Sequence, residues 1–281
     1  MHKETKRLWL GLALAAGMLL PGCVSMKAVQ DYAVASHKTL EGVQSVAKDY
    51  SASCLRANRY RPLSEHSKCV DEKAAAKGLQ SAAAVLDAYV VALGALAADD
   101  LVHYDTEIGA LAGEVKKSGI ITNSAQVDAF ASLAAFIAKA ATSAYQQKQV
   151  AKYVTLADAA VGTASKALAD AISTNYPARI DNELVFWTQS YTRVETAERI
   201  KHPLDWEAYA STQWQVRTDL EAKAAAAMAL TKSVDAIGKT HAELKKDAEH
   251  LSGKELLAAV SSFVATAQPV LKDVQEAFAH K

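Results

Sequence analysis

The chain has 281 residues with 31 basic and 31 acidic side chains, and roughly one residue in five is alanine, whereas glycine and proline supply only 12 and 5 residues. Because alanine is the strongest helix former, this composition predicts a mostly helical protein. The charge is balanced and the longest basic runs are pairs, Lys116-Lys117 and Lys245-Lys246, so we expect no nucleic-acid binding.

Residues 1–22 have the organisation of a secretory signal. Three basic side chains and one acidic side chain precede an uncharged stretch at 8–20, which a proline and a glycine follow. A basic segment, a short apolar segment and small residues before a cleavage site are typical of a signal peptide. The apolar stretch is shorter than the roughly twenty residues with which a helix crosses a bilayer. We therefore expect residues 1–22 to be removed, which leaves 28 basic and 30 acidic residues.

Leu20-Pro21-Gly22-Cys23 resembles the lipobox of bacterial lipoproteins. The resemblance covers only the signal segment, and it implies that Cys23 becomes the first mature residue and carries the lipid. It also implies an outer-membrane destination in Gram-negative bacteria, because Val24 rather than an aspartate follows the cysteine. A multi-chain lipid gives stable membrane attachment where a single chain is marginal. We expect a protein held by Cys23 to the periplasmic face of the outer membrane; the alternative is a buried cysteine in an apolar N-terminal helix.

The first helix of the mature chain is expected to end near Cys54. Apolar and small residues recur along it at steps of three and four: Ala33, Ser36, Leu40, Val43, Ala47, Tyr50 and Cys54. Cys54 and Cys69 are the only other cysteines, and an even pair in an oxidising compartment predicts a disulfide. The bridge would close the turn between two helices. A metal site that includes His66 is the alternative, although zinc needs more ligands at closer spacing.

Three further helices are expected before the two C-terminal ones. The second covers residues 69–117, with a bend near Gly94 or Gly109, and the third covers residues 124–175. Tyr176-Pro177 is expected to end the third helix, because proline lacks the N–H that a helix interior requires. The fourth covers residues 179–201, and His202-Pro203 opens the fifth.

Two regular apolar seams mark the C-terminal helices, which are expected to meet near Ser252. The first seam is Ala227, Leu230, Val234, Ile237, His241, Leu244, Ala248 and Leu251, and the second is Leu257, Val260, Val264, Ala267, Leu271, Val274 and Phe278. Alternating steps of three and four indicate helices packed side by side as in coiled coils. The sequence therefore predicts an all-α, elongated, up-and-down bundle of about six helices. No linker rich in proline, glycine or serine divides it, so we expect residues 23–281 to form one domain.

Three carboxylate–histidine clusters occur at helical spacing and are candidate metal sites. They are Asp99, Asp100, His103 and Glu107; Glu195, Glu198 and His202; and Glu243, Asp247 and His250. Helical bundles hold two metals with Glu-x-x-His pairs and further glutamates, a pattern that these clusters do not reproduce. Exposed ion pairs between residues three or four apart are the favoured interpretation. We expect no cofactor and no metal.

No motif for a nucleophile, a phosphate-binding loop or a zinc protease is present, so the sequence predicts a non-enzymatic protein. One histidine, His241, interrupts an apolar seam. It could act as a pH-responsive switch, but a hydrogen-bonded or partly exposed histidine near the bundle edge is favoured.

The tryptophans of the mature chain all lie between residues 186 and 214, together with two tyrosines. Exposed Trp and Tyr near arginines are typical of protein-binding surfaces, which makes this segment the candidate partner surface. Its residues are Trp187, Tyr191, Trp206, Tyr209 and Trp214. The favoured alternative is that the rings pack within the hairpin between the fourth and fifth helices.

The resulting hypothesis is a lipid-anchored scaffold that docks another envelope protein or a second copy of itself. A membrane-active or pore-forming bundle is a second hypothesis, supported only by the apolar stretch 85–98. A metal-dependent enzyme is the third. The sequence does not identify the partner.

Overall fold

The computed structural model describes residues 22–98, 107–141, 150–248 and 254–279. Seven α-helices and one short 3-10 helix, and no strand, make up the described part. They are α1 (Gly22–Asn58), η1 (Leu63–Glu65), α2 (Val70–Ala97), α3 (Ile108–Ser118), α4 (Ser124–Ala141), α5 (Val150–Glu198), α6 (Pro203–Lys246) and α7 (Lys254–Phe278). The predicted all-α fold is confirmed.

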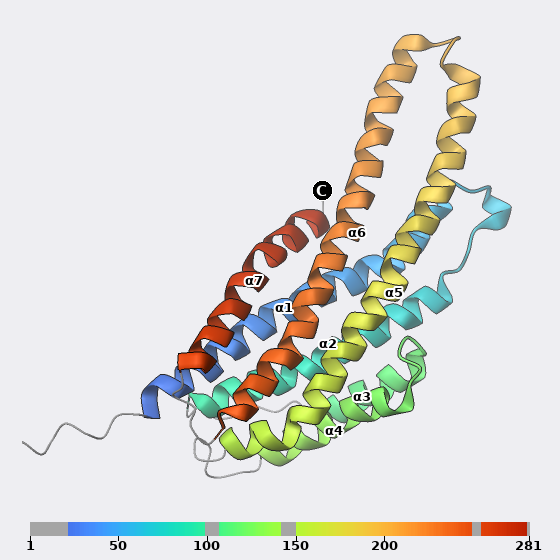
Figure 1. Cartoon of the computed structure of the whole chain (residues 1–281). Helices are drawn as coiled ribbons and strands as arrows, with labels where there is room; N and C mark the ends of the chain where they lie inside the picture. Colours follow the sequence, from blue (N-terminus) through green and yellow to red (C-terminus); the bar gives the residue numbers. More distant parts are fainter. Residues whose placement is uncertain (1–21, 99–106, 142–149, 249–253, 280–281) are drawn as a thin grey trace, which may run out of the picture.

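The long helices α1, α2, α5 and α6 form the centre of the bundle (Figure 1). The most extensive contacts join α5 to α6 and α1 to α2. α7 covers α1 and α6 on one side, while α3 and α4 pack against α2 and α5. The predicted first-helix seam is confirmed, because Ala33, Leu40 and Val43 are buried. On α7 the expected seam residues Val260, Ala267 and Val274 are buried, whereas Leu256 and Phe263 are buried in place of the expected Leu257 and Val264.

Two of the expected helices are each divided in the structure. The second, expected over 69–117, consists of α2 and α3, and the third, expected over 124–175, consists of α4 and the first half of α5. The chain folds back between α2 and α3, so that Ser118 at the end of α3 contacts Gly78 near the start of α2. This return buries Ile108 and Val115 against the core, which a single straight helix would leave exposed.

Pro177 does not end a helix, contrary to the sequence expectation. α5 runs without interruption from Val150 to Glu198 and contains Pro177 in its interior. Its neighbours on both sides are held by other helices: the Tyr176 hydroxyl donates to Asp49 of α1, and Arg179 pairs with Glu72 of α2. These tertiary contacts offset the loss of the backbone hydrogen bond that proline cannot donate inside a helix.

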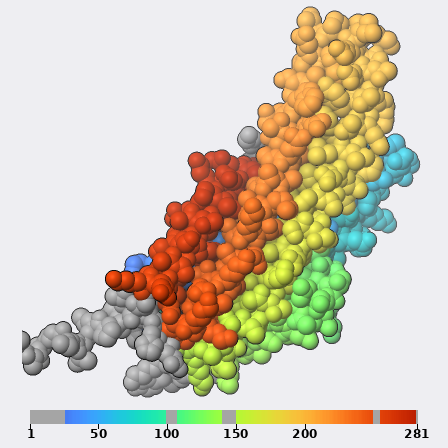
Figure 2. Space-filling model, viewed as in Figure 1, coloured from blue at the N-terminus to red at the C-terminus, as the bar shows by residue number. Residues whose placement is uncertain are grey.

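The molecule is elongated because the α5–α6 hairpin extends past the ends of α1 and α7 (Figures 1 and 2). The hairpin turn lies at the opposite end of the molecule from the start of α1. We call residues 187–214 of this hairpin the arm. Residues 1–21 of the expected signal segment, and the side chain of Cys23, lie outside the described part.

Among the described residues, only α2 is long and apolar enough by composition to cross a membrane. Its apolar side chains lie in the core: Val85, Leu86, Val90 and Leu93 are at most 1 % exposed. The stretch that supported the pore-forming hypothesis is thus packed against other helices in this fold.

Candidate functional site: the arm and its root

The five aromatic residues nominated from the sequence form a single cluster between α5 and α6. Trp187 stacks on Tyr191 with ring centroids 5.1 Å apart, and both rings contact Trp214 edge-on. Trp206 and Tyr209 contact Tyr191 at 5.2 and 6.2 Å. Trp187 and Trp206 are buried, so they form the core of the arm and offer little surface to a partner. Trp214, which is 50 % exposed, is the tryptophan that a partner could reach.

Polar contacts hold this aromatic core in place. The indole Nε1 of Trp187 donates to the side-chain oxygen of Gln213 at 3.1 Å. The Arg217 guanidinium lies over the rings of Trp214 and Trp187 and also donates to Glu221. Arg217 is therefore already engaged within the hairpin.

The turn of the arm exposes two large apolar side chains that the sequence analysis did not nominate. α5 ends at Glu198 and α6 begins at Pro203, as the His202-Pro203 pair predicts. Ile200 is 93 % exposed and Leu204 is 80 % exposed. The sequence did contain a signal for this tip, because a large apolar residue stands on each side of the His202-Pro203 pair.

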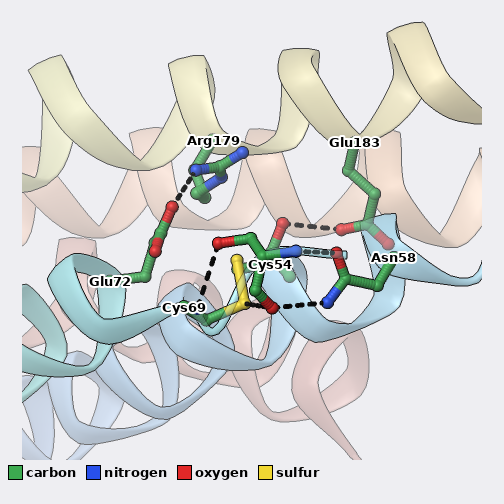
Figure 3. The surroundings of a disulfide bond; sticks show 8 residues. Cys54, Asn58, Cys69, Glu72, Arg179 and Glu183 are labelled. Carbon is green, nitrogen blue, oxygen red and sulfur yellow. Dashed lines mark hydrogen bonds and ion pairs between the residues drawn. A yellow bond between two sulfur atoms is a disulfide. The ribbon is translucent and has the colours of Figure 1, made fainter. Parts of the chain in front are cut away.

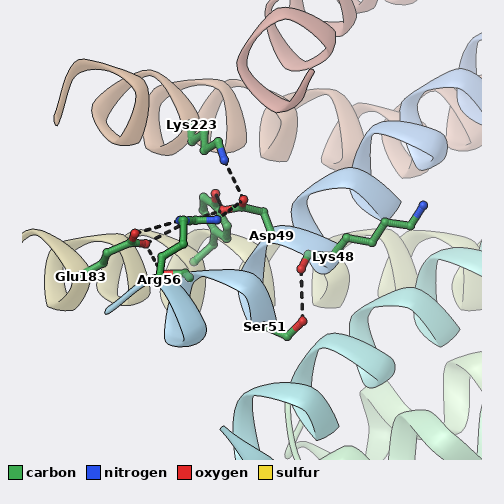
Figure 4. A network of polar contacts seen from close by, with 8 residues as sticks. Lys48, Asp49, Ser51, Arg56, Glu183 and Lys223 are labelled. Carbon is green, nitrogen blue, oxygen red and sulfur yellow. Dashed lines mark hydrogen bonds and ion pairs between the residues drawn. The ribbon is translucent and has the colours of Figure 1, made fainter. Parts of the chain in front are cut away.

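We call the part of the hairpin next to the arm, where α5 and α6 contact α1, the root of the arm. A buried polar cluster joins the three helices there (Figure 4). Arg56 of α1 donates to both oxygens of Asp49, at 2.7 and 2.9 Å, and to both oxygens of Glu183, at 2.8 and 3.0 Å. Lys223 of α6 donates to Asp49 at 2.7 Å, and the Tyr176 hydroxyl donates to Asp49 at 2.8 Å. Two cations thus balance two carboxylates in a region that solvent barely reaches.

The protonation states follow from this pairing. Burial alone would raise the pKa of Asp49, but the hydrogen bonds and charges of Arg56 and Lys223 lower it overall. Burial acts against the charged form of Arg56, yet Asp49 and Glu183 raise the pKa of the guanidinium. Burial and the nearby Asp49 both raise the pKa of Tyr176, which therefore remains a hydrogen-bond donor. These shifts favour ionised Asp49 and Arg56 and a neutral Tyr176 within the cluster.

Sequence reasoning missed this cluster, although one signal was present. Glu183 lies on an apolar seam of α5 between Ile180 and Trp187, at steps of three and four. A carboxylate at such a position is buried, and a buried charge requires a partner. The identity of that partner, Arg56, could not be read from the sequence, because the two residues are 127 positions apart.

His241 is fully buried, which corrects the expectation of a partly exposed position and confirms the expectation of hydrogen bonding. Its Nε2 lies 2.7 Å from the Tyr89 hydroxyl, and its Nδ1 lies 3.2 Å from Asp158. Lys245 donates to the other oxygen of Asp158 at 2.9 Å. A neutral imidazole that carries its proton on Nδ1 satisfies both partners, with Tyr89 as donor and Asp158 as acceptor.

Burial lowers the pKa of His241, despite the opposing effect of Asp158. The hydrogen bond from His241, followed by the one from Lys245, lowers the pKa of Asp158 to about 2. Near neutral pH the pair is therefore a neutral histidine beside an ionised aspartate. The imidazole itself has no exposed surface and is contacted by the rings of Tyr32 and Tyr89.

Cys54 and Cys69 form the predicted disulfide, and both residues are buried (Figure 3). Cys69 precedes α2 and has a positive φ of 53°. The connecting loop is closed by Asn58, whose side chain donates to the Ser67 carbonyl and accepts from the Ser67 N–H. The bridge therefore brings the start of α2 against the last turns of α1.

The three carboxylate–histidine clusters do not assemble as a metal site in the described residues. Asp99, Asp100, His103 and His250 lie outside the described part, whereas Glu107 is described and has a partner. Glu195 pairs with Arg199, Glu198 with His202, and Glu243 with Lys246, which is the expected pattern of exposed ion pairs.

One described group, Cys54, Cys69 and Glu72, has ligand atoms within 4.8 Å of one another. The two sulfurs are bonded to each other, and Glu72 pairs with Arg179. Thiolates, not disulfide sulfurs, bind metals. This group is therefore a covalent and ionic link between helices.

Comparisons with protein-family models, with curated proteins and with solved structures found no match for this chain. The functional assignment therefore depends on the fold and on the geometry of the arm.

Proposed function

We propose that this protein is a non-enzymatic, lipid-anchored scaffold of the bacterial envelope that docks a partner protein through the tip of its arm. Cys23 tethers the start of α1 to the periplasmic face of the outer membrane, as the lipobox-like segment before it suggests. The arm tip lies at the far end of the molecule from α1's first turn (Figure 1). An anchor and a docking element at opposite ends suit a protein that reaches away from a membrane surface.

The observation that carries the proposal is the exposure of Ile200 and Leu204, at 93 % and 80 %. Leaving two such side chains in water forgoes roughly 1.5–3 kcal/mol for each, which a complementary apolar pocket would recover. They lie at the short turn that joins two long helices, α5 and α6.

A protein partner accounts for the tip better than a membrane does. Glu198, Asp205 and Glu207 surround the apolar pair and disfavour an anionic lipid surface. The basic side chains of the same turn are Arg199 and His202, which pair with acidic residues of the arm, and the exposed Lys201. Residues 198–207 therefore contain three carboxylates against two Lys/Arg side chains and have no excess positive charge to attract lipid phosphates.

Site-specific photo-crosslinking in intact cells tests the docking site. A benzophenone amino acid at Leu204 of the full chain should give one discrete adduct with a second protein, and Ile200→Glu should abolish it. The control is the same probe at Leu156, an exposed residue (61 %) near the start of α5 and away from the arm. Equal adducts at both sites would contradict the proposal. An adduct of twice the chain mass would also contradict it, because it would indicate self-association. So would labelling of lipid alone.

Mass spectrometry of the mature N-terminus tests the anchor separately. We expect the chain to begin at a lipid-modified Cys23, and Cys23→Ala to remain unmodified and uncleaved. An uncut and unmodified N-terminus in the parent protein would rule out the lipid anchor without bearing on the arm.

A further inference from the structure

The residues around the Cys54–Cys69 disulfide reach α5 from two directions. On the α1 side, Ser53 and Arg56 flank Cys54, and both donate to Glu183, with Ser53 at 2.7 Å. On the α2 side, Glu72 accepts from Arg179 at 2.6 Å. Figure 3 shows the bridge between these two sets of contacts.

The loop that the disulfide closes supplies a third contact. The Arg61 guanidinium lies 4.4 Å from the ring centroid of Phe186, within the range of a cation–π interaction. The loop backbone is fixed by Asn58 and by His66, which contacts the Arg61 carbonyl. Arg61 is thus placed by a loop whose two ends are covalently joined.

The three contacted residues, Arg179, Glu183 and Phe186, follow one another at steps of four and three. Residues at this spacing lie on one face of a helix. All three lie immediately before the arm. Beyond them, the hydrogen bonds, ion pairs and ring contacts of the described arm residues are made within the hairpin itself.

From this geometry we infer that the Cys54–Cys69 disulfide is a positioning element that sets the direction of the arm. The bridge holds the end of α1, the loop and the start of α2 together. These three segments thereby contact one face of α5 at Arg179, Glu183 and Phe186, directly before the arm. Without the bridge, the loop regains conformational freedom, and Glu72 and Arg61 no longer meet α5 at fixed positions. The arm then swings about its root while the rest of the bundle stays folded. This inference does not depend on what the arm binds.

Hydrogen-exchange mass spectrometry of the full chain tests the inference. In the Cys54→Ala/Cys69→Ala protein, peptides from residues 176–198 and 203–223 should exchange about tenfold faster than in the parent, because the root opens locally. Peptides from α3, α4 and α7 should keep the exchange rates of the parent. Faster exchange confined to residues 54–73 would overturn the inference. So would a uniform increase in every helix, which would show that the bridge supports only global stability.

A second double variant tests the contacts with α5 while leaving the disulfide intact. It also tests the inference if the Cys54→Ala/Cys69→Ala chain does not fold. Glu72→Gln combined with Arg61→Gln keeps the disulfide and removes two of the contacts with α5. We expect faster exchange at the same α5 and α6 peptides. Lys166→Gln is the control, since it removes an exposed ion pair with Asp170 on the same helix, away from the root. Unchanged exchange in the Glu72→Gln/Arg61→Gln protein would overturn the inference, whether or not a partner is ever found for the tip.

Discussion

Glu183 is a carboxylate with no exposed surface, and it accepts hydrogen bonds from Arg56 and Ser53. Desolvating two ions costs several kcal/mol for each, and the attraction between them offsets this cost only in a fully paired geometry. The cluster supplies that geometry with two cations and two carboxylates. Its contribution to the fold is therefore visible mainly when one partner is removed.

Replacing Arg56 by methionine should lower the free energy of unfolding by about 3–5 kcal/mol, because Asp49 and Glu183 are left as buried carboxylates without their shared partner. Urea denaturation followed by circular dichroism measures this change. Lys166→Met, which removes an exposed ion pair, should have a much smaller effect, because solvent screens such pairs. Equal losses in both variants would show that the buried cluster has no special role.

His241 gives the fold a pH dependence whose sign follows from its lowered pKa. The unfolded chain binds a proton at the ordinary pKa of about 6.5, whereas the buried imidazole resists protonation. Stability is therefore fully present above that value and falls as the pH drops below it, toward the lower pKa of the folded state. Asp158 adds a separate loss at more acidic pH, below its ordinary pKa of about 4.

We expect the parent chain to unfold at a lower urea concentration at pH 5.5 than at pH 7.5. His241→Gln should be less stable at pH 7.5 and should show a smaller difference between the two pH values, since the titrating group is gone. The control is His202→Gln at the exposed tip, which should keep the full difference. A His241→Gln protein with undiminished pH dependence would place the effect elsewhere.

At the scale of helices, the bundle is slender because small residues let α5 and α6 approach closely. A Cβ built on Gly238 of α6 would overlap the Ser165 hydroxyl and would lie 3.0 Å from the Cα of Gly162 on α5. A Cβ on Gly162 would meet nothing within 4 Å. Two glycines that face the same crossing thus have opposite steric environments.

Gly238→Ala should destabilise the protein by about 1–3 kcal/mol, because the two helices must separate to admit the methyl group. Gly162→Ala should be neutral or stabilising by up to about 1 kcal/mol, since alanine loses less backbone entropy in a helix. Thermal unfolding of both variants checks the contrast. If Gly162→Ala proves as damaging as Gly238→Ala, the helix crossing differs from the one described.

The continuity of α5 through Pro177 gives a second prediction at this scale. Pro177→Ala should raise the free energy of unfolding by about 1–2 kcal/mol: the roughly 3 kcal/mol penalty of an interior proline is relieved, and about 1 kcal/mol is offset by a freer unfolded chain. Denaturant titration measures the change. If proline ended a helix here instead, the substitution would bring no such gain, and a loss of stability would contradict the prediction.

At the scale of the whole molecule, the arm is separated from the core that holds the bundle together. Its apolar tip residues are almost fully exposed, whereas the core lies among α1, α2, α5 and α6. A change at the tip can therefore affect docking without affecting folding. This separation is what a docking element on a scaffold requires.

Ile200→Glu combined with Leu204→Glu should leave the unfolding temperature of the purified chain within about 1–2 °C of the parent, since surface changes of this kind alter stability by about 0.5 kcal/mol or less. Differential scanning calorimetry checks this expectation. A large drop would show that the tip is packed in the folded protein and would remove the basis for placing the partner there.

The sequence by itself determined the helical class, the seams of α1 and α6, and the disulfide. These features depend on local periodicity, on composition and on there being one pair of cysteines besides Cys23. It also determined the turn at His202-Pro203, because proline fixes the start of a helix locally. The lipid anchor at Cys23 remains a prediction from sequence resemblance.

Only the tertiary structure decided where α2 and α4 end, why α5 continues through Pro177, and which charges meet at the root of the arm. In each case residues distant in sequence supply the energy: Gly78 receives Ser118, and Arg56 pairs with Glu183. Local propensities differ by only a few kcal/mol at most, so contacts of this kind override them. The exposure of the arm tip follows from the same cause, because a side chain is buried or exposed only once its neighbours in space are fixed.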